Sequence, residues 1–141
     1  MTLSRQEYEA IIYRITESSE YIHYSDMVLI PVGRHLATLS GKIYFENDIY
    51  LEIREALDFD LENWITGYGY VVYKGNKRQY WYDSQEHPDD PVLATTHPHH
   101  KHIPPNIKRN RIPAPNLSFS ESNIPFLIDE IEKNFFAVGE V

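Results

Sequence analysis

The chain has 141 residues, no cysteine and a formal net charge of −8 at pH 7. The lack of cysteine excludes a disulfide framework, a thiolate metal site and a cysteine nucleophile, and the acidic charge argues against generic binding to nucleic acid. A hydrophobic fraction of 42% in a chain of this length indicates a single domain over residues 1–141.

An N-terminal helix is predicted within residues 1–22. The segment Ser4-Arg5-Gln6-Glu7 has a capping-box pattern, in which Ser4 and Glu7 each bind the other's backbone amide through their side chains. The apolar residues that follow have the spacing of one buried helical stripe: Tyr8, Ile11, Ile12 and Ile15.

An antiparallel sheet of about five strands is predicted over residues 26–83. Two-residue turns at Asn47-Asp48 and Gly75-Asn76 suit tight hairpins, because these residue types tolerate the backbone angles that such turns require. The expected strands are Asp26–Val32, Lys42–Glu46, Asp48–Arg54, Trp64–Lys74 and Lys77–Asp83.

The two hairpins carry different side chains. One face of the first hairpin is apolar, and the other combines aromatic and charged residues: Tyr44, Tyr50, Glu52 and Arg54. This mixed face is either the wall of a site or a surface ion pair of little energetic value. The second hairpin is densely aromatic up to Tyr82, which favours cross-strand packing and, as an alternative, offers stacking surfaces to bases.

The amino-acid composition changes over residues 84–121. Eight of the nine prolines lie from Pro88 to Pro125, and no glycine occurs between Gly75 and Gly139. Such a segment is stiff and extended, and we expect it to wrap over the sheet as a Pro/His-rich loop. A C-terminal helix over 122–136 follows, with Pro125 in its first turn.

The most concentrated chemistry is the run His97-Pro98-His99-His100-Lys101-His102, which contains four of the seven histidines. The flanking prolines disfavour a helix, so we expect this run to form an ordered loop. Alternation in an extended segment places His100 and His102 on one side, with His99 and Lys101 on the other.

Three interpretations of this run remain open. In the first, His99, His100 and His102 exchange protons with RNA, and Lys101 and Arg54 bind the phosphate. In the second, the histidines bind a metal ion together with Asp83 or His87, although their spacing matches no structural zinc motif. In the third, the histidines are structural and hydrogen-bond to the backbone of the loop.

The order of several motifs resembles one known family. These motifs are Arg-x-x-x-Tyr-Asp at Arg78–Asp83, His87-Pro88, Pro-His-His-Lys-His at Pro98–His102, and a closing helix. In this order they are similar to the TumE-type toxins of prokaryotic toxin–antitoxin modules, over roughly Gly41 to Ile131. The chain departs from the family pattern at Asn47-Asp48, where Asp-Gly is common, and at residues 84–87, where one histidine is missing.

The resemblance implies a growth-inhibiting toxin that acts on RNA and is neutralised by a cognate, DNA-binding antitoxin. No signal peptide or membrane-spanning run is visible, so we expect a cytoplasmic protein with no membrane partner. We predict an α+β fold and a metal-independent ribonuclease or translation inhibitor that uses no cofactor. A non-enzymatic binding module and a His-ligated, metal-dependent hydrolase are the alternatives.

The predicted site combines two groups of residues, and no residue is assigned as a metal ligand. The catalytic candidates are His99, His100, His102 and Asp83. The substrate-binding candidates are Lys101, Arg54, Tyr82, Tyr50 and Tyr44.

Overall fold

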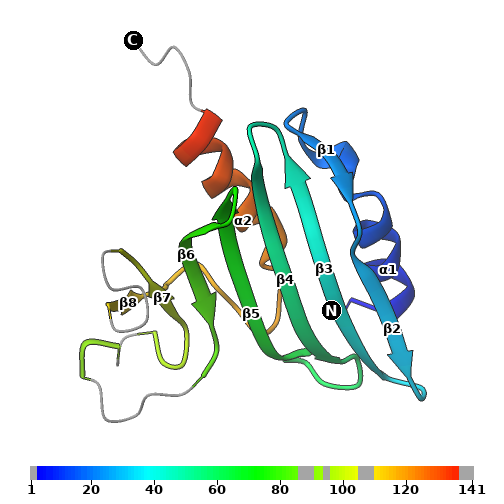
Figure 1. Cartoon of the computed structure of the whole chain (residues 1–141). Helices are drawn as coiled ribbons and strands as arrows, with labels where there is room; N and C mark the ends of the chain where they lie inside the picture. Colours follow the sequence, from blue (N-terminus) through cyan, green and yellow to red (C-terminus); the bar gives the residue numbers. More distant parts are fainter. Residues whose placement is uncertain (1–2, 86–90, 94–95, 105–109, 137–141) are drawn as a thin grey trace.

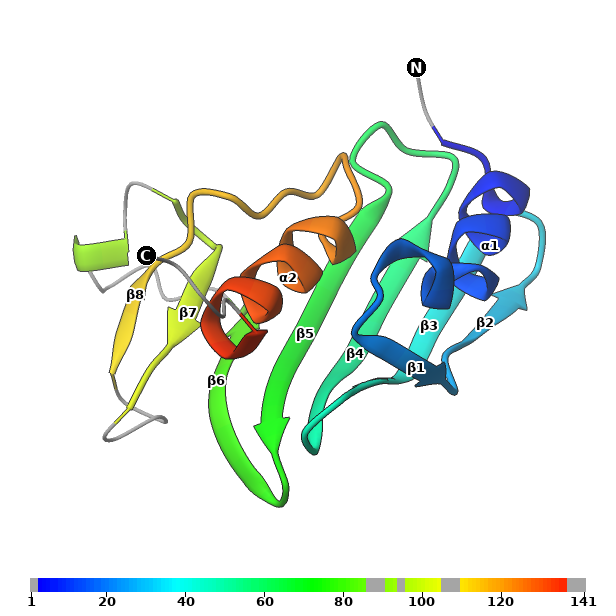
Figure 2. The ribbon, with the colours of Figure 1, turned by 90° about the horizontal axis from the view of Figure 1, so that it is seen from above.

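The computed structural model describes residues 3–85, 91–93, 96–104 and 110–136. In this part of the chain, both α-helices lie on one face of a single antiparallel sheet of eight strands (Figures 1 and 2). Among the described residues no helix covers the opposite face, which we call the open face. The predicted α+β class is therefore confirmed.

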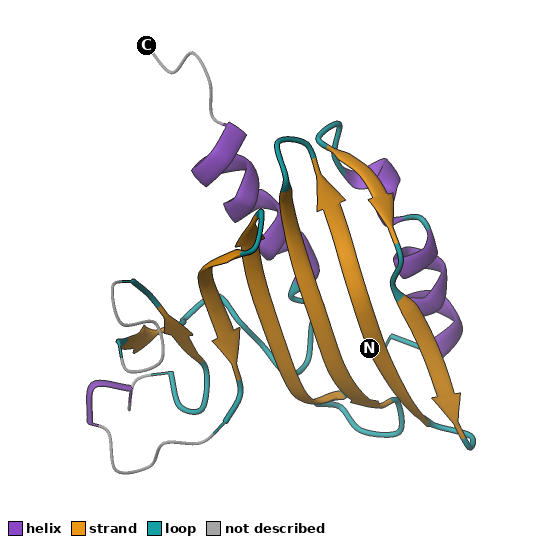
Figure 3. Ribbon diagram, in the orientation of Figure 1, coloured by secondary structure: helices purple, strands orange, loops and turns teal. Residues whose placement is uncertain are grey.

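The sheet is larger than the predicted five strands (Figure 3). Its strands are β1 (Ile22–Ser25), β2 (Val28–Val32), β3 (Leu36–Phe45), β4 (Ile49–Asp58), β5 (Ile65–Lys74), β6 (Lys77–Asp83), β7 (His100–His102) and β8 (Arg111–Pro113). The helical segments are α1 (Arg5–Tyr13), α2 (Ile124–Ile131), the 3-10 turns η1 (Ile15–Ser18) and η2 (Pro91–Leu93), and the π-helical turn η3 (Glu132–Phe136).

The first helix begins with the predicted capping box. The amide of Glu7 donates to Ser4 Oγ at 3.1 Å, and the amide of Ser4 donates to Glu7 Oε1 at 3.0 Å. Tyr8 and Ile12 are buried on the side of α1 that faces the sheet. The helix ends at Tyr13, well before the end of the predicted range 1–22. It is followed by the 3-10 turn η1.

Strands β1 and β2 both pair with β3, which has ten residues and is long enough for two short partners. The chain passes from β1 to β2 across Gly41, where a Cβ atom would lie only 2.5 Å from Met27 Cα. Gly41 also has a φ of 140°, which L side chains rarely adopt. Gly41 thus allows the close backbone approach at Met27, between β2 and β1, a strand that the sequence pattern did not reveal.

The two predicted hairpins are present, with longer strands in the first. In the turn between β3 and β4, Asn47 and Asp48 have φ angles of 63° and 60°, as a tight hairpin requires. Strands β5 and β6 match the predicted second hairpin, with a turn at Gly75 and Asn76.

The core lies between the sheet and the two helices. A buried charged group, the carboxylate of Glu55 on β4, lies within it. Tyr8 of α1 donates to Glu55 Oε1 at 2.6 Å, and Tyr70 of β5 donates to Oε2 at 2.5 Å. Asn123, the residue before α2, donates to the Tyr70 hydroxyl at 3.0 Å. This polar chain connects both helices to the centre of the sheet.

The Pro/His-rich segment differs from the predicted loop, and the loop prediction for the histidine run was wrong. Residues His100–His102 form β7, which pairs with the end of β6 and with β8. The three residues fit between Pro98 and Pro104, so no proline interrupts the ladder. The predicted C-terminal helix is present as α2, with Pro125 in its first turn. None of the described helices is long and apolar enough to span a membrane.

Candidate functional site

The site originates in the register of the sheet. Arg54 on β4 pairs with Gly69 on β5, and Gly69 pairs with Asp83 on β6. Asp83 pairs in turn with His100 on β7. Directly paired residues point to the same face, so these residues form one cross-strand row, which we call the Arg54–His100 row. The burial pattern of β4 assigns this row to the open face, because Arg54 is exposed while its neighbours Ile53 and Glu55 are buried.

Gly69 leaves a gap in this row that the Arg54 side chain uses. A Cβ atom added at Gly69 would lie 3.7 Å from Arg54 Nη2, so the guanidinium extends over β5. A shallow pocket of about 630 Å³ opens here, and its lining includes Arg54, Gly67, Gly69, Asp83 and Ser84. The structure thus brings two of the predicted site residues, Arg54 and Asp83, to one pocket.

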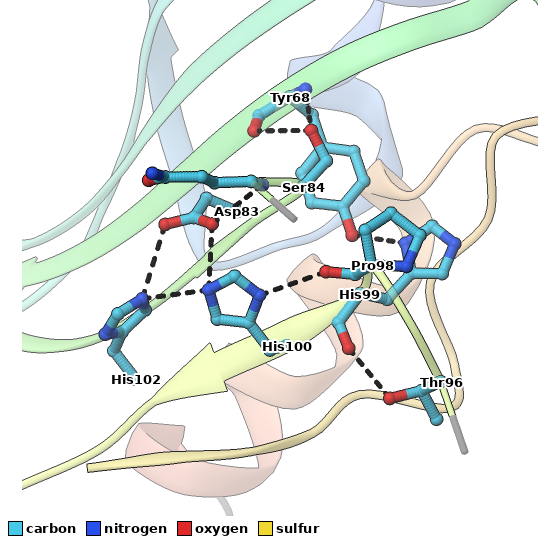
Figure 4. A network of polar contacts seen from close by, with 9 residues as sticks. Tyr68, Asp83, Ser84, Thr96, Pro98, His99, His100 and His102 are labelled. Carbon is cyan, nitrogen blue, oxygen red and sulfur yellow. Dashed lines mark hydrogen bonds and ion pairs between the residues drawn. The ribbon is translucent and has the colours of Figure 1, made fainter. Parts of the chain in front are cut away.

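Behind the pocket, Asp83, His100 and His102 form a compact cluster, which we call the Asp83 cluster (Figure 4). Nε2 of His100 lies 2.8 Å from Asp83 Oδ1, and Nε2 of His102 lies 3.3 Å from Asp83 Oδ2. The two Nε2 atoms are 3.1 Å apart. The side chain of His100 is 0% exposed and that of His102 is 7% exposed, whereas Asp83 is 27% exposed. Among the three, Asp83 is therefore the residue with most access to solvent.

The electrostatics of the cluster favour an ionised carboxylate. Burial alone raises the pKa of Asp83, but hydrogen bonds from His100 and His102 outweigh this and hold the pKa well below its ordinary value. Burial lowers the pKa of His100, but the hydrogen bond and charge of Asp83 dominate and raise it overall. Without a metal ion, the two residues stabilise each other as an ion pair.

Neighbouring groups orient the members of the Asp83 cluster. Nδ1 of His100 lies 3.0 Å from the carbonyl oxygen of Pro98, and the amide of Gln85 donates to Asp83 Oδ1 at 3.0 Å. The ring of Trp81 packs against His102 with centroids 4.4 Å apart. Each member is thus held by at least one contact outside the cluster.

His99 belongs to a different environment. Its Nδ1 faces the hydroxyl of Tyr68 in a short hydrogen bond (Figure 4), and its ring also packs against Phe119. Burial lowers the pKa of His99. The structure therefore separates this predicted catalytic residue from the Asp83 cluster.

Lys101 and Tyr82 lie on the face that the helices cover. Lys101 Nζ is 3.0 Å from Glu130 Oε2 of α2, and the Tyr82 hydroxyl donates to the same oxygen at 2.7 Å. Tyr82 is buried, and Lys101 is half-buried. These two predicted substrate-binding residues are on the opposite side of the sheet from Arg54, and they connect β6 and β7 to α2.

Tyr44 and Tyr50 belong to a second row on the open face. Four directly paired residues form it across four strands: Tyr24, Tyr44, Tyr50 and Tyr73. Their ring centroids are 5.3, 5.8 and 4.7 Å apart in that order, and we call them the tyrosine row. Nζ of Lys42 lies 5.3 Å from the centroid of the Tyr50 ring. The row therefore combines exposed aromatic surface with a cation.

Sequence reasoning missed Gly69 and Ser84 in the pocket, and Tyr24 and Tyr73 in the tyrosine row. The glycine had a usable signal, because Gly67 and Gly69 interrupt an otherwise bulky strand, and such glycines mark close approach by another group. The two tyrosines required knowledge of the register. His87, the alternative metal ligand, lies outside the described residues.

Comparison with known protein families gives a match over most of this chain. The family model described as Toxin TumE matches residues 11–135, which include every residue of the pocket, the Asp83 cluster and the tyrosine row. No curated protein and no solved structure matches the chain.

Proposed function

This chain belongs to the TumE family of toxins, and on that premise we propose that it arrests growth by cleaving RNA on the open face of its sheet. The observation that carries the proposal is the Arg54–His100 row, which places a guanidinium and the Asp83 cluster on two sides of one pocket. A phosphodiester carries a negative charge that the Arg54 guanidinium can bind. Its cleavage needs groups that donate or accept protons, or that stabilise the charge developing in the transition state.

Single-stranded RNA fits the remainder of this face. Tyr50 of the tyrosine row is four residues from Arg54 along β4, which is a distance of about 13 Å. Such a separation allows bases to stack on the tyrosines while a nearby phosphate reaches Arg54. On this face Lys42 lies over the Tyr50 ring and Arg78 over the Trp81 ring, so the overall negative charge does not prevent local binding of RNA.

The residues of the Asp83 cluster have unequal access to such a substrate. His100 has no exposed surface and cannot contact RNA in this conformation, whereas Asp83 lines the pocket. We therefore assign contact with the substrate to Asp83 and Arg54, and a supporting position behind Asp83 to His100 and His102.

The test compares growth and RNA ends after expression without antitoxin. The wild type is expected to stop growth and to produce new RNA ends at defined positions. Arg54→Ala is expected to relieve the arrest and to remove those ends. Arg14→Ala is the matched control, because Arg14 is exposed at the end of α1, which lies on the covered face, and forms an ion pair with Glu17.

Two outcomes contradict the proposal. Growth arrest without new RNA ends in the wild type would exclude ribonuclease activity and favour a non-enzymatic block by binding. Unchanged toxicity of Arg54→Ala would exclude the pocket as the active region, whatever the reaction.

The toxin family implies a cognate antitoxin. We propose that this antitoxin binds DNA and that both proteins act in the cytoplasm, where the RNA is. The neighbouring reading frame tests this part, because a small gene that encodes a DNA-binding motif is expected there. Failure of the gene product to bind the chain would reject the assignment.

A further inference from the structure

We propose that Asp83, His100 and His102 bind one divalent transition-metal ion of the zinc class, with an open coordination position toward the Arg54 pocket. The ion binding stands on the geometry of these three residues alone. Its use in cleavage rests on the proposed function.

The spacing of the three ligand atoms suits such an ion. Zinc binds imidazole nitrogen and carboxylate oxygen at about 2.0–2.2 Å, so two ligands of a tetrahedral site are about 3.3 Å apart. In the Asp83 cluster, His100 Nε2 is 2.8 Å from Asp83 Oδ1, His102 Nε2 is 3.3 Å from Asp83 Oδ2, and the two nitrogens are 3.1 Å apart. A small ion can therefore contact both nitrogens and a carboxylate oxygen of Asp83 with little movement of the side chains.

The orientation of His100 also suits metal binding. A carbonyl oxygen only accepts hydrogen bonds, so the 3.0 Å contact with Pro98 O assigns a proton to Nδ1 of His100. In the neutral ring, Nε2 then carries the lone pair, and this atom faces Asp83 and His102. Backbone carbonyls commonly orient metal-binding histidines in this way.

The surrounding contacts match those of a supported metal site. The amide of Gln85 donates to the Asp83 carboxylate, and the Trp81 ring packs against His102. Such outer contacts hold ligands in place and reduce the entropy that binding would otherwise cost.

The type and number of donors indicate which ions are suitable. Two imidazoles and one carboxylate favour zinc, cobalt, nickel or iron(II) over magnesium and calcium, which prefer oxygen. Three protein ligands are typical of catalytic zinc sites, which leave a position for water or substrate. The cluster meets the pocket on its Asp83 side, so a phosphate oxygen held by Arg54 can reach that position. The ion would then offset negative charge on the phosphate.

Metal binding to the untagged full chain, cleared of metal with a chelator, is the direct test. Titration with ZnCl₂ in a calorimeter is expected to show one equivalent of tight binding, and MgCl₂ is expected to show none. His100→Ala and His102→Ala are each expected to weaken zinc binding about 100-fold or more, since even the loss of supporting contacts costs 10- to 100-fold.

His35→Ala is the matched control, because His35 pairs with Asp58 at another place on the sheet and is expected to bind zinc like the wild type. Should the histidine variants not fold, Asp83→Asn provides the same comparison at a partly exposed position. The absorption spectrum of the Co²⁺-loaded chain gives a further measurement, and an intense visible band is expected for a four-coordinate site.

The outcomes separate the two proposals. No saturable zinc binding, or binding that His100→Ala and Asp83→Asn leave intact, would overturn the metal site and leave an Asp–His ion pair only. Tight binding with RNA ends that appear equally with and without zinc would overturn the catalytic use of the ion. Tight binding in a chain that produces no RNA ends would preserve the metal site and reject the ribonuclease.

Discussion

The space above Gly69 controls where the Arg54 guanidinium lies. Valine suits the extended backbone of β5, but its methyl groups would occupy the volume that Arg54 Nη2 approaches. We expect Gly69→Val to fold and to lose RNA cleavage by about 10-fold or more, because a charged hydrogen bond contributes about 1.5–3 kcal/mol.

Thermal melting and the yield of RNA ends measure the two effects of this change. Gly69→Ala is the control, since its Cβ would be at an ordinary contact distance of 3.7 Å from Arg54 and should preserve most activity. Equal activity in the valine variant would show that the position of Arg54 is unimportant.

Glu55 makes stability depend on pH. Burial raises the pKa of Glu55 above its ordinary value of 4.5, and this effect exceeds the opposing hydrogen bonds from Tyr70 and Tyr8. The folded state therefore keeps the proton to higher pH than the unfolded state, and this contribution to stability is lost as pH rises from 4.5 through the folded pKa.

The variant Glu55→Gln cannot titrate at this position. The unfolding free energy of the variant minus that of the wild type should therefore become more positive as pH rises through this interval. Urea denaturation of both proteins at several pH values from 4.5 to 8 gives the comparison. Subtracting the two curves removes the contributions of other groups, including the Asp83–His100 pair. A difference that does not change with pH would contradict a raised pKa.

At the scale of elements, Glu130 attaches the paired strands β6 and β7 to α2. Its Oε2 atom binds Lys101 of β7 and Tyr82 of β6, and both contacts are largely shielded from water. Glu130→Ala would leave the half-buried Lys101 without this partner, so we expect a loss of about 1–3 kcal/mol in unfolding free energy.

Hydrogen exchange is the measurement for this variant, and faster exchange is expected at the amides of β7. Asp129→Ala is the neighbouring control, because its pair with Lys133 is exposed to solvent and should contribute little to stability. Similar effects of the two variants would show that Glu130 does not anchor β7.

For the whole molecule, the two faces of the sheet have different roles. The covered face holds the core, so truncating a half-buried tyrosine on the open face should spare folding. We expect Tyr50→Ala to weaken binding of a short single-stranded RNA by about 5- to 150-fold, as the loss of one stacked base at about 1–3 kcal/mol implies.

Fluorescence anisotropy with a labelled RNA measures this affinity. Leu61→Ala is a suitable control, because Leu61 is an exposed apolar residue in the connection between β4 and β5, outside the tyrosine row. Equal affinity of wild type and Tyr50→Ala would exclude the tyrosine row as a binding surface.

The sequence predicts the parts of this molecule that depend on local pattern. The capping box at Ser4, the turn at Asn47 and the β5–β6 hairpin are visible because neighbouring residues determine them. Strands β1 and β7 were not predicted, because their pairing depends on distant partners: the approach to Gly41 in one case and the end of β6 in the other.

The candidate site follows the same rule. Alternation correctly separated His100 and His102 from Lys101, since this needs only an extended backbone. The partners of Lys101 and His99 could not be predicted from the sequence, because Glu130 and Tyr68 are far from them along the chain.

The position of β7 in the chain has a consequence for biosynthesis. Arg54 and Asp83 precede the histidines, and β7 can join β6 only after His100–His102 have left the ribosome. A nascent chain that ends before residue 100 therefore contains the pocket residues but not the Asp83 cluster. If the proposed cleavage of RNA requires this cluster, the nascent chain is inactive until residues 100–102 have left the ribosome and paired with β6.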